Sequence, residues 1–134
     1  MKIEHIGIAV QDLARSNALF AAILGQQPYK QEHVESEHVH VSFFQVGDSK
    51  IELLEATGSE SAIAKHIEKR GEGLHHVAFE VPDIYAAMER MKAQGCRVLN
   101  EAPKRGADNK LIFFLHPKDT NGVLVELCQE IADK

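Results

Sequence analysis

An internal repeat is the feature that most constrains the fold of this chain. Residues 5–12 read HIGIAVQD and residues 76–83 read HVAFEVPD, and in both a histidine precedes an aspartate by seven positions. Between them, apolar residues alternate with small or polar ones, which is the two-residue period of a β-strand. The sequence therefore predicts two copies of one supersecondary unit.

Each copy continues in the same order. Asp12 and Asp83 are candidate N-caps for helices that end near Gly25 and Gly95. Strand-like runs follow each helix: Val39–Val46 and Lys50–Ala56 in the first copy, and Arg97–Leu99, Leu111–Leu115 and Val123–Gln129 in the second. This order predicts a single α+β domain over 1–134, with a first module at 1–58, a linking helix at 59–72 and a second module at 73–130.

A glutamate occupies the matching last strand of each copy. Glu52 lies in IELL and Glu126 in VELC, so each carboxylate sits inside an apolar strand. Such a placement is costly unless the charge is paired or bound to a metal. The alternation of the strands lets four side chains share one face, with the small residues Gly7, Ala9 and Ala78 leaving room beside them. We therefore predict a metal site with the ligands His5, Glu52, His76 and Glu126.

A simpler interpretation exists for each residue alone. A histidine at a strand start is more often a hydrogen-bonded structural residue, and a strand glutamate usually faces solvent. The recurrence of the His–Glu pair in both copies favours the metal. Two imidazoles and two carboxylates suit Co²⁺, Ni²⁺, Mn²⁺, Fe²⁺ or Zn²⁺.

The other histidines are predicted to be structural or solvated. His33, His38 and His40 stand among three glutamates, a cluster that resembles a metal site, but we expect a solvated strand and its lead-in there. We expect His75 to have the opposite orientation from His76 and to play a supporting role.

Composition excludes some classes of function. The net charge of −5 argues against a nucleic-acid-binding protein. No segment approaches the roughly 18 apolar residues of a membrane span, and the N-terminus lacks a signal-peptide pattern. Two cysteines outside a C-x-x-C pair suit a reducing compartment. We therefore expect a cytoplasmic protein with no nucleic-acid or membrane partner.

The chain resembles the methylmalonyl-CoA epimerases of the vicinal-oxygen-chelate superfamily. The stretches that carry the resemblance cover nearly the whole chain: IEHIGIAV, VGDSKIELLEA, SAIAKHIEKRGEGLHHVAFEV and FLHPKDTNGVLVEL. The resemblance implies paired βαβββ modules that form a cupped mixed sheet around a metal site, in a homodimer. It also implies a divalent ion on His5, His76 and Glu126 with Glu52 as fourth ligand, Co²⁺ being the first choice.

The reaction that the resemblance implies is epimerisation of (R)- and (S)-methylmalonyl-CoA, an acyl-CoA substrate of propionate metabolism. A proton leaves and returns at the carbon alpha to the thioester, through a metal-stabilised enolate. Some similar proteins have a glutamine where this chain has Glu52, and a glutamate base where it has Val41. Because valine cannot transfer protons, we expect Glu52 to act with Glu126 as the catalytic pair, ahead of Glu35 and Glu37.

Two alternatives remain at this point. Glyoxalase I (lactoylglutathione lyase) shares the His/Glu/His/Glu pattern, and four ligands alone do not separate it from an epimerase. A non-catalytic small-molecule-binding protein of the same fold is the third interpretation, although such proteins typically lose metal ligands. Lys104 and Lys118 are candidates to bind the substrate carboxylate or the CoA phosphates.

Overall fold

The chain folds as two compact units. The computed structural model describes residues 1–132, so the last two positions of the predicted domain 1–134 lie outside the described residues. One unit, called the N-terminal unit, is His5–His75. The other, the C-terminal unit, combines Met1–Glu4 with the residues from His76 onwards.

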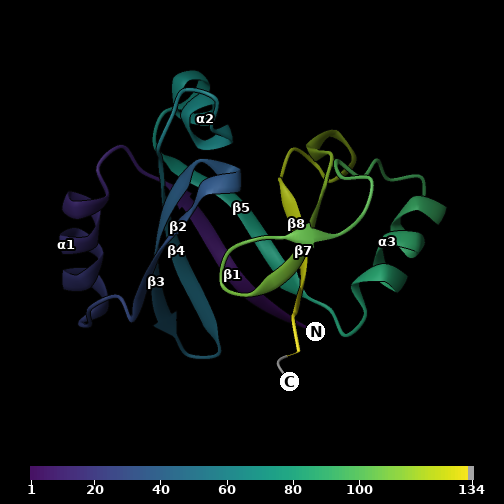
Figure 1. The fold of residues 1–134 in the computed structure, drawn as a ribbon, viewed down its shortest axis with the longest axis horizontal. Coiled ribbons are helices and arrows are strands. Elements are labelled where there is room, and N and C mark those ends of the chain that lie inside the picture. Colours follow the sequence, from purple (N-terminus) through teal and green to yellow (C-terminus); the bar gives the residue numbers. More distant parts are fainter. Residues whose placement is uncertain (133–134) are drawn as a thin grey trace. The chain divides into compact units, whose positions relative to one another are not determined.

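The N-terminal unit contains a four-stranded stretch of sheet in the order β2-β3-β4-β1 (Figure 1). Strand β1 pairs with β4 in parallel, and the β4–β3 and β3–β2 pairs are antiparallel. The elements are β1 (Lys2–Ala9, from His5 onwards in this unit), α1 (Leu13–Leu24), β2 (Lys30–Val34), the 3₁₀ turn η1 (Glu35–Glu37), β3 (Val39–Val46), β4 (Ser49–Ala56) and α2 (Ala62–Arg70).

Helix α1 covers one face of this sheet. The Asp12 carboxylate accepts a hydrogen bond from the Arg15 backbone N–H, which caps the helix, and Gly25 ends it in the left-handed conformation at φ 69°. Leu13 packs with Phe44 and Leu53 in the core between the helix and the sheet. The His5 side of β1 is thereby left on the opposite face of the sheet, as the alternation predicts.

The C-terminal unit repeats this topology. Its strands run in the order β5-β8-β7-β6, with β5 parallel to β8 and antiparallel pairs beyond (Figure 1). Helix α3 packs on the face that carries Phe113 and Leu127. The elements are β5 (Gly73–Glu80, from His76 onwards in this unit), α3 (Ile84–Ala93), β6 (Lys104–Arg105), β7 (Lys110–Leu115), the 3₁₀ turn η2 (Pro117–Asp119) and β8 (Val125–Glu130).

The paired βαβββ modules of an α+β fold are thus confirmed, with differences in detail. Strands β2 and β6 were not predicted, because KQEHV is polar and partly exposed throughout and KR is only two residues long. The expected strand Arg97–Leu99 is wrong: only Val98 forms an isolated bridge, to Leu115. None of the helices in residues 1–132 has both the length and the apolar character to cross a membrane.

An ion pair holds the turn η2 against the segment that follows α3. The Arg97 side chain donates from Nε and Nη2 to the two Asp119 carboxylate oxygens, each at 3.0 Å, and the Arg97 backbone N–H donates to Oδ2 at 2.8 Å. These hydrogen bonds from the Arg97 side chain and backbone lower the pKa of Asp119 to about 2. The pair therefore makes the stability of the C-terminal unit depend on pH.

The sign of that dependence follows from the lowered pKa. The stabilisation by Asp119 is complete above the unfolded pKa of about 3.9 and disappears as the pH falls through the folded value near 2. The measurement is urea unfolding of the metal-free protein at a series of pH values. Between about pH 5 and about pH 2, we expect the free energy of unfolding to fall more in the wild type than in the Asp119→Asn variant. Equal losses in the two proteins would show that this carboxylate does not contribute.

Candidate metal centre

The first histidine–glutamate pair lies in the N-terminal unit. His5 on β1 and Glu52 on β4 are both buried. The parallel register places Glu52 opposite Gly7, so the glutamate shares the face of β1 that carries His5. His5 Nδ1 lies 3.1 Å from Glu52 Oε2. Two of the four predicted ligands therefore lie next to each other.

The second pair repeats the arrangement in the C-terminal unit. His76 on β5 and Glu126 on β8 are buried, and Glu126 lies opposite Ala78. His76 Nε2 lies 3.2 Å from Glu126 Oε1. The small residues beside the two glutamates, Gly7 and Ala78, occupy equivalent register positions, as expected from the repeat.

The geometry of each pair fits a divalent ion. Adjacent ligands with metal bonds of about 2.1 Å have donor atoms about 3 Å apart. The N···O distances of 3.1 Å and 3.2 Å match that separation. A hydrogen bond would give a similar distance. The metal is favoured because imidazole and carboxylate groups are the donors that such ions prefer. Both pairs are also buried and recur at one register position. All four residues belong to groups that could hold a metal.

A phenylalanine, not predicted from the sequence, stands beside each of the two glutamates. Phe43 on β3 lies opposite Glu52, and Phe114 on β7 lies opposite Glu126. The Phe114 ring meets the His76 ring edge to face, with centroids 5.8 Å apart. The repeated FF at 43–44 and 113–114 was the available signal. An aromatic residue therefore occupies the register position beside each of these glutamates.

The surroundings of the pairs contain further ionisable groups that were missed. Glu4 and Lys110 are buried in the C-terminal unit, with Lys110 Nζ 3.8 Å from Glu4 Oε2. Burial raises the pKa of the Cys128 thiol, so it remains neutral and donates to the Phe79 carbonyl oxygen at 3.6 Å. Val41 is fully buried and apolar.

Three other histidines, His66, His75 and His116, make ring or backbone contacts outside the two pairs. His66 and His75 meet edge to face, with ring centroids 4.9 Å apart, and burial, followed by the charge of Arg70, lowers the pKa of His66. His116 accepts a hydrogen bond at Nδ1 from the Lys118 backbone N–H at 3.1 Å, which caps η2. None of these three was predicted to bind metal.

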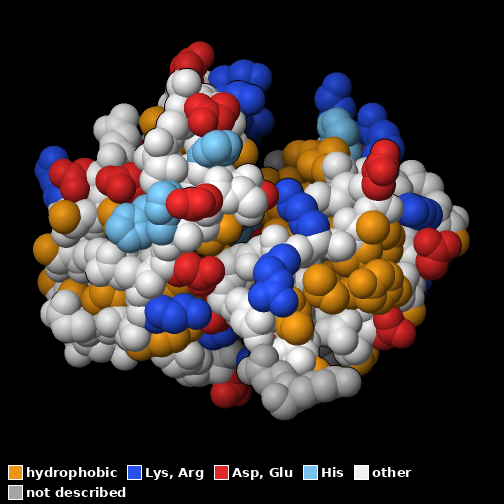
Figure 2. All heavy atoms as spheres, in the orientation of Figure 1, with side chains coloured by type: hydrophobic (Ala, Val, Ile, Leu, Met, Phe, Trp, Pro, Cys, Tyr) orange, Lys and Arg blue, Asp and Glu red, His pale blue; other side chains and the backbone are white. Residues whose placement is uncertain are grey.

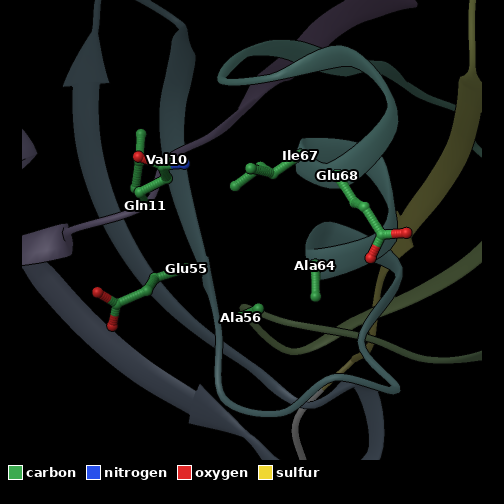
Figure 3. Close-up of a pocket in the computed structure, with 7 residues that line it drawn as sticks. All are labelled: Val10, Gln11, Glu55, Ala56, Ala64, Ile67 and Glu68. Atoms are coloured by element: carbon green, nitrogen blue, oxygen red, sulfur yellow. The ribbon is translucent and has the colours of Figure 1, made fainter.

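A separate hollow of about 310 Å³ lies in the N-terminal unit between α2 and the end of β4 (Figure 3). Ile67 points from the helix toward Val10, Ala64 points toward Ala56, and Glu55 and Glu68 stand at the margins. Glu55 is already engaged, because its Oε2 accepts from the Leu13 backbone N–H at 2.8 Å. None of the predicted ligands lines this hollow.

Comparison with known proteins agrees with this architecture. A family model described as the Glyoxalase/Bleomycin resistance protein/Dioxygenase superfamily matches residues 4–114. The ethylmalonyl-CoA/methylmalonyl-CoA epimerase of Cereibacter sphaeroides is 43% identical over 96% of this chain and 97% of its own length. The mitochondrial methylmalonyl-CoA epimerase of Homo sapiens is 41% identical over 96% of this chain and 73% of its own length.

The solved structures that resemble this chain also include methylmalonyl-CoA epimerases. A variant of Streptomyces coelicolor methylmalonyl-CoA epimerase in complex with 2-nitronate-propionyl-CoA superposes with a TM-score of 0.92 and 38% identity, covering 98% of this chain and 99% of that one. The chain therefore belongs to the glyoxalase-like superfamily and, within it, to the methylmalonyl-CoA epimerase family. Lactoylglutathione lyases are more distant: that of Vibrio parahaemolyticus is 28% identical over 96% of this chain and 90% of its own length.

Proposed function

We propose that this protein is a metal-dependent epimerase that interconverts (R)- and (S)-methylmalonyl-CoA. The observation that carries the proposal is the pair of buried His–Glu couples at one register position of two repeated sheets, in a chain 43% identical to an epimerase of such substrates. Ethylmalonyl-CoA is a close analogue that the same chemistry would accept.

The metal ligands in this proposal are His5, Glu52, His76 and Glu126. A divalent ion held by these side chains would supply Lewis acidity that lowers the cost of charge developing on the thioester oxygen. Co²⁺ is the first choice, and Ni²⁺, Mn²⁺, Zn²⁺ and Fe²⁺ have compatible ligand preferences. The 3.1 Å and 3.2 Å separations of the histidine nitrogens from the carboxylate oxygens are those of neighbouring ligands on one ion.

Proton transfer falls to the two carboxylates. The carbon between a thioester and a carboxylate bears a weakly acidic hydrogen, and inversion there needs a base on one face and an acid on the other. We assign these roles to Glu126 and Glu52. Support comes from the burial of both and from Val41, which leaves its own position without a proton acceptor.

Glu52→Gln tests this assignment. The amide oxygen can still bind a metal, but it cannot accept the proton, so we expect the variant to retain metal while turnover falls roughly 100-fold. The measurement pairs metal content with the rate of epimer interconversion. Glu35→Gln and Glu37→Gln are matched controls on η1 and should keep wild-type rates. Full turnover by metal-loaded Glu52→Gln would remove this residue from the mechanism.

The competing functions are separated by substrate. Parallel assays with single-epimer methylmalonyl-CoA and with the hemithioacetal of glutathione and methylglyoxal should give turnover with the first only. Turnover of the hemithioacetal would indicate a glyoxalase I. Metal-free protein that Co²⁺ does not activate on either substrate would indicate a binding protein. A cytoplasmic location, a homodimeric state and the modules 1–58 and 73–130 joined by 59–72 complete the proposal.

A further inference from the structure

A second pair of histidines lies on the edge of the N-terminal sheet. His33 on β2 and His40 on β3 are direct partners in the antiparallel register, so their side chains project from the same face. Their ring centroids are 6.2 Å apart and the planes are inclined by 55°. Strand β2 is the outermost strand of this sheet, which leaves the pair accessible from solvent.

Both rings are available to a ligand. His33 is exposed and His40 is half-buried, and within residues 1–132 neither ring takes part in a hydrogen bond or an ion pair. The neighbouring groups are engaged elsewhere. His38 Nδ1 lies 3.3 Å from Glu60 Oε1, and Glu55, opposite His40 on β4, accepts from the Leu13 backbone N–H.

The separation of the rings suits a shared metal ion. With metal–nitrogen bonds of about 2.1 Å, two imidazoles on one ion have ring centres between roughly 4.5 Å apart at adjacent positions and roughly 6.4 Å apart at opposite positions. The observed 6.2 Å lies inside that range. Rotation of the exposed His33 ring about its side-chain bonds can shorten the distance further.

The local charge also favours a cation. Glu32, Glu35 and Glu37 accompany the two histidines, and Lys30 is the one basic residue between positions 30 and 40. Figure 2 shows histidine and acidic side chains gathered on the surface over β2 and β3. The sequence predicted only a lead-in where His33 lies, and the cross-strand pairing of His33 with His40 depends on the register of β2 with β3.

We propose that His33 and His40 form a second, surface metal site, separate from the proposed catalytic one. The ions that this site binds are the borderline divalent ions that prefer imidazole, namely Ni²⁺, Cu²⁺ and Zn²⁺. Water completes the coordination, so the site binds more weakly than the buried ligand set. The protein then takes up one more ion per chain than its reaction requires.

Nickel binding to the untagged, metal-stripped full chain tests the site. Calorimetric titration of the wild type with Ni²⁺ should show two classes of site. His40→Gln and His33→Gln should each remove the weaker class while leaving Co²⁺-supported turnover and the circular dichroism spectrum unchanged. His38→Gln is the matched control and should retain both classes. In the Cu²⁺ paramagnetic resonance spectrum, the same two variants should lose one component coupled to two nitrogens, while the component from His5 and His76 remains.

Four results would overturn the proposal. The first is a single class of sites in the wild type. The second is an unchanged weaker class in both His33→Gln and His40→Gln. The third is an equal loss in His38→Gln, which would make the binding a property of the general histidine and glutamate density. Loss of turnover in His40→Gln would also contradict the separation of the two sites.

Discussion

Glu126→Gln is expected to lower the rate of epimerisation roughly 1,000-fold, because the change removes a proton-transfer group and replaces an anionic metal ligand with a neutral one. Glu126 is buried, and its carboxylate lies 3.2 Å from the His76 ring. A glutamine there presents either an amide NH₂ or a neutral oxygen to the ion, and neither can accept the proton. Turnover of the metal-loaded variant should therefore fall, and the affinity for the ion should also fall because the ligand has lost its negative charge.

A control on the same strand isolates this effect. Glu130 lies at the exposed end of β8, and Glu130→Gln should leave turnover and metal content unchanged. Single-turnover rates at saturating Co²⁺ distinguish weak metal binding from lost chemistry. Wild-type turnover and metal content in Glu126→Gln would contradict the assignment of this residue to the site.

Lys110→Met is expected to destabilise the protein by about 3 kcal/mol, because breaking a buried ion pair leaves an uncompensated charge. The Lys110 side chain is buried, with its Nζ 3.8 Å from both Glu4 Oε2 and Asp108 Oδ2. Methionine has a similar length and a similar apolar stem. The decrease in the free energy of unfolding therefore measures the effect of removing the ammonium charge. Urea unfolding near neutral pH measures the difference in free energy of unfolding.

Two further variants separate the ion pair from simple packing. Glu4→Gln in the Lys110→Met background should recover part of the lost stability, because it removes the unpaired carboxylate. Glu130→Gln, whose Oε1 lies 4.0 Å from Lys110 Nζ on an exposed side chain, should change stability by less than about 0.5 kcal/mol. If the double variant were less stable than Lys110→Met, the Glu4–Lys110 pair would not be the cause.

The repeat explains why so much of the candidate site could be predicted. Side chains alternate strictly along a strand, so the parity of His5 against Ile6 and of Glu126 against Leu127 determined which residues share a face. Two copies of the His–Glu pattern then compensated for the weak signal of each residue alone. The aspartate caps at 12 and 83 were predictable because the side chain reaches only its own first turn.

Features that depend on register could not be predicted in the same way. Glu4 and Lys110 are far apart in sequence, and nothing local distinguishes a buried lysine from an exposed one. The His33–His40 pair requires the turn at η1, where His38 takes the left-handed conformation at φ 53°. Strand β2 was missed because both of its faces are polar, so no hydrophobic period marks it.

The most direct test of the proposed function is proton exchange at the reacting carbon. Metal-stripped protein is incubated with a single epimer of methylmalonyl-CoA in D₂O, with and without Co²⁺, and deuterium at the central carbon is followed together with the epimer ratio. The proposed function predicts metal-dependent deuterium incorporation accompanied by racemisation. The absence of exchange with every divalent ion would contradict it.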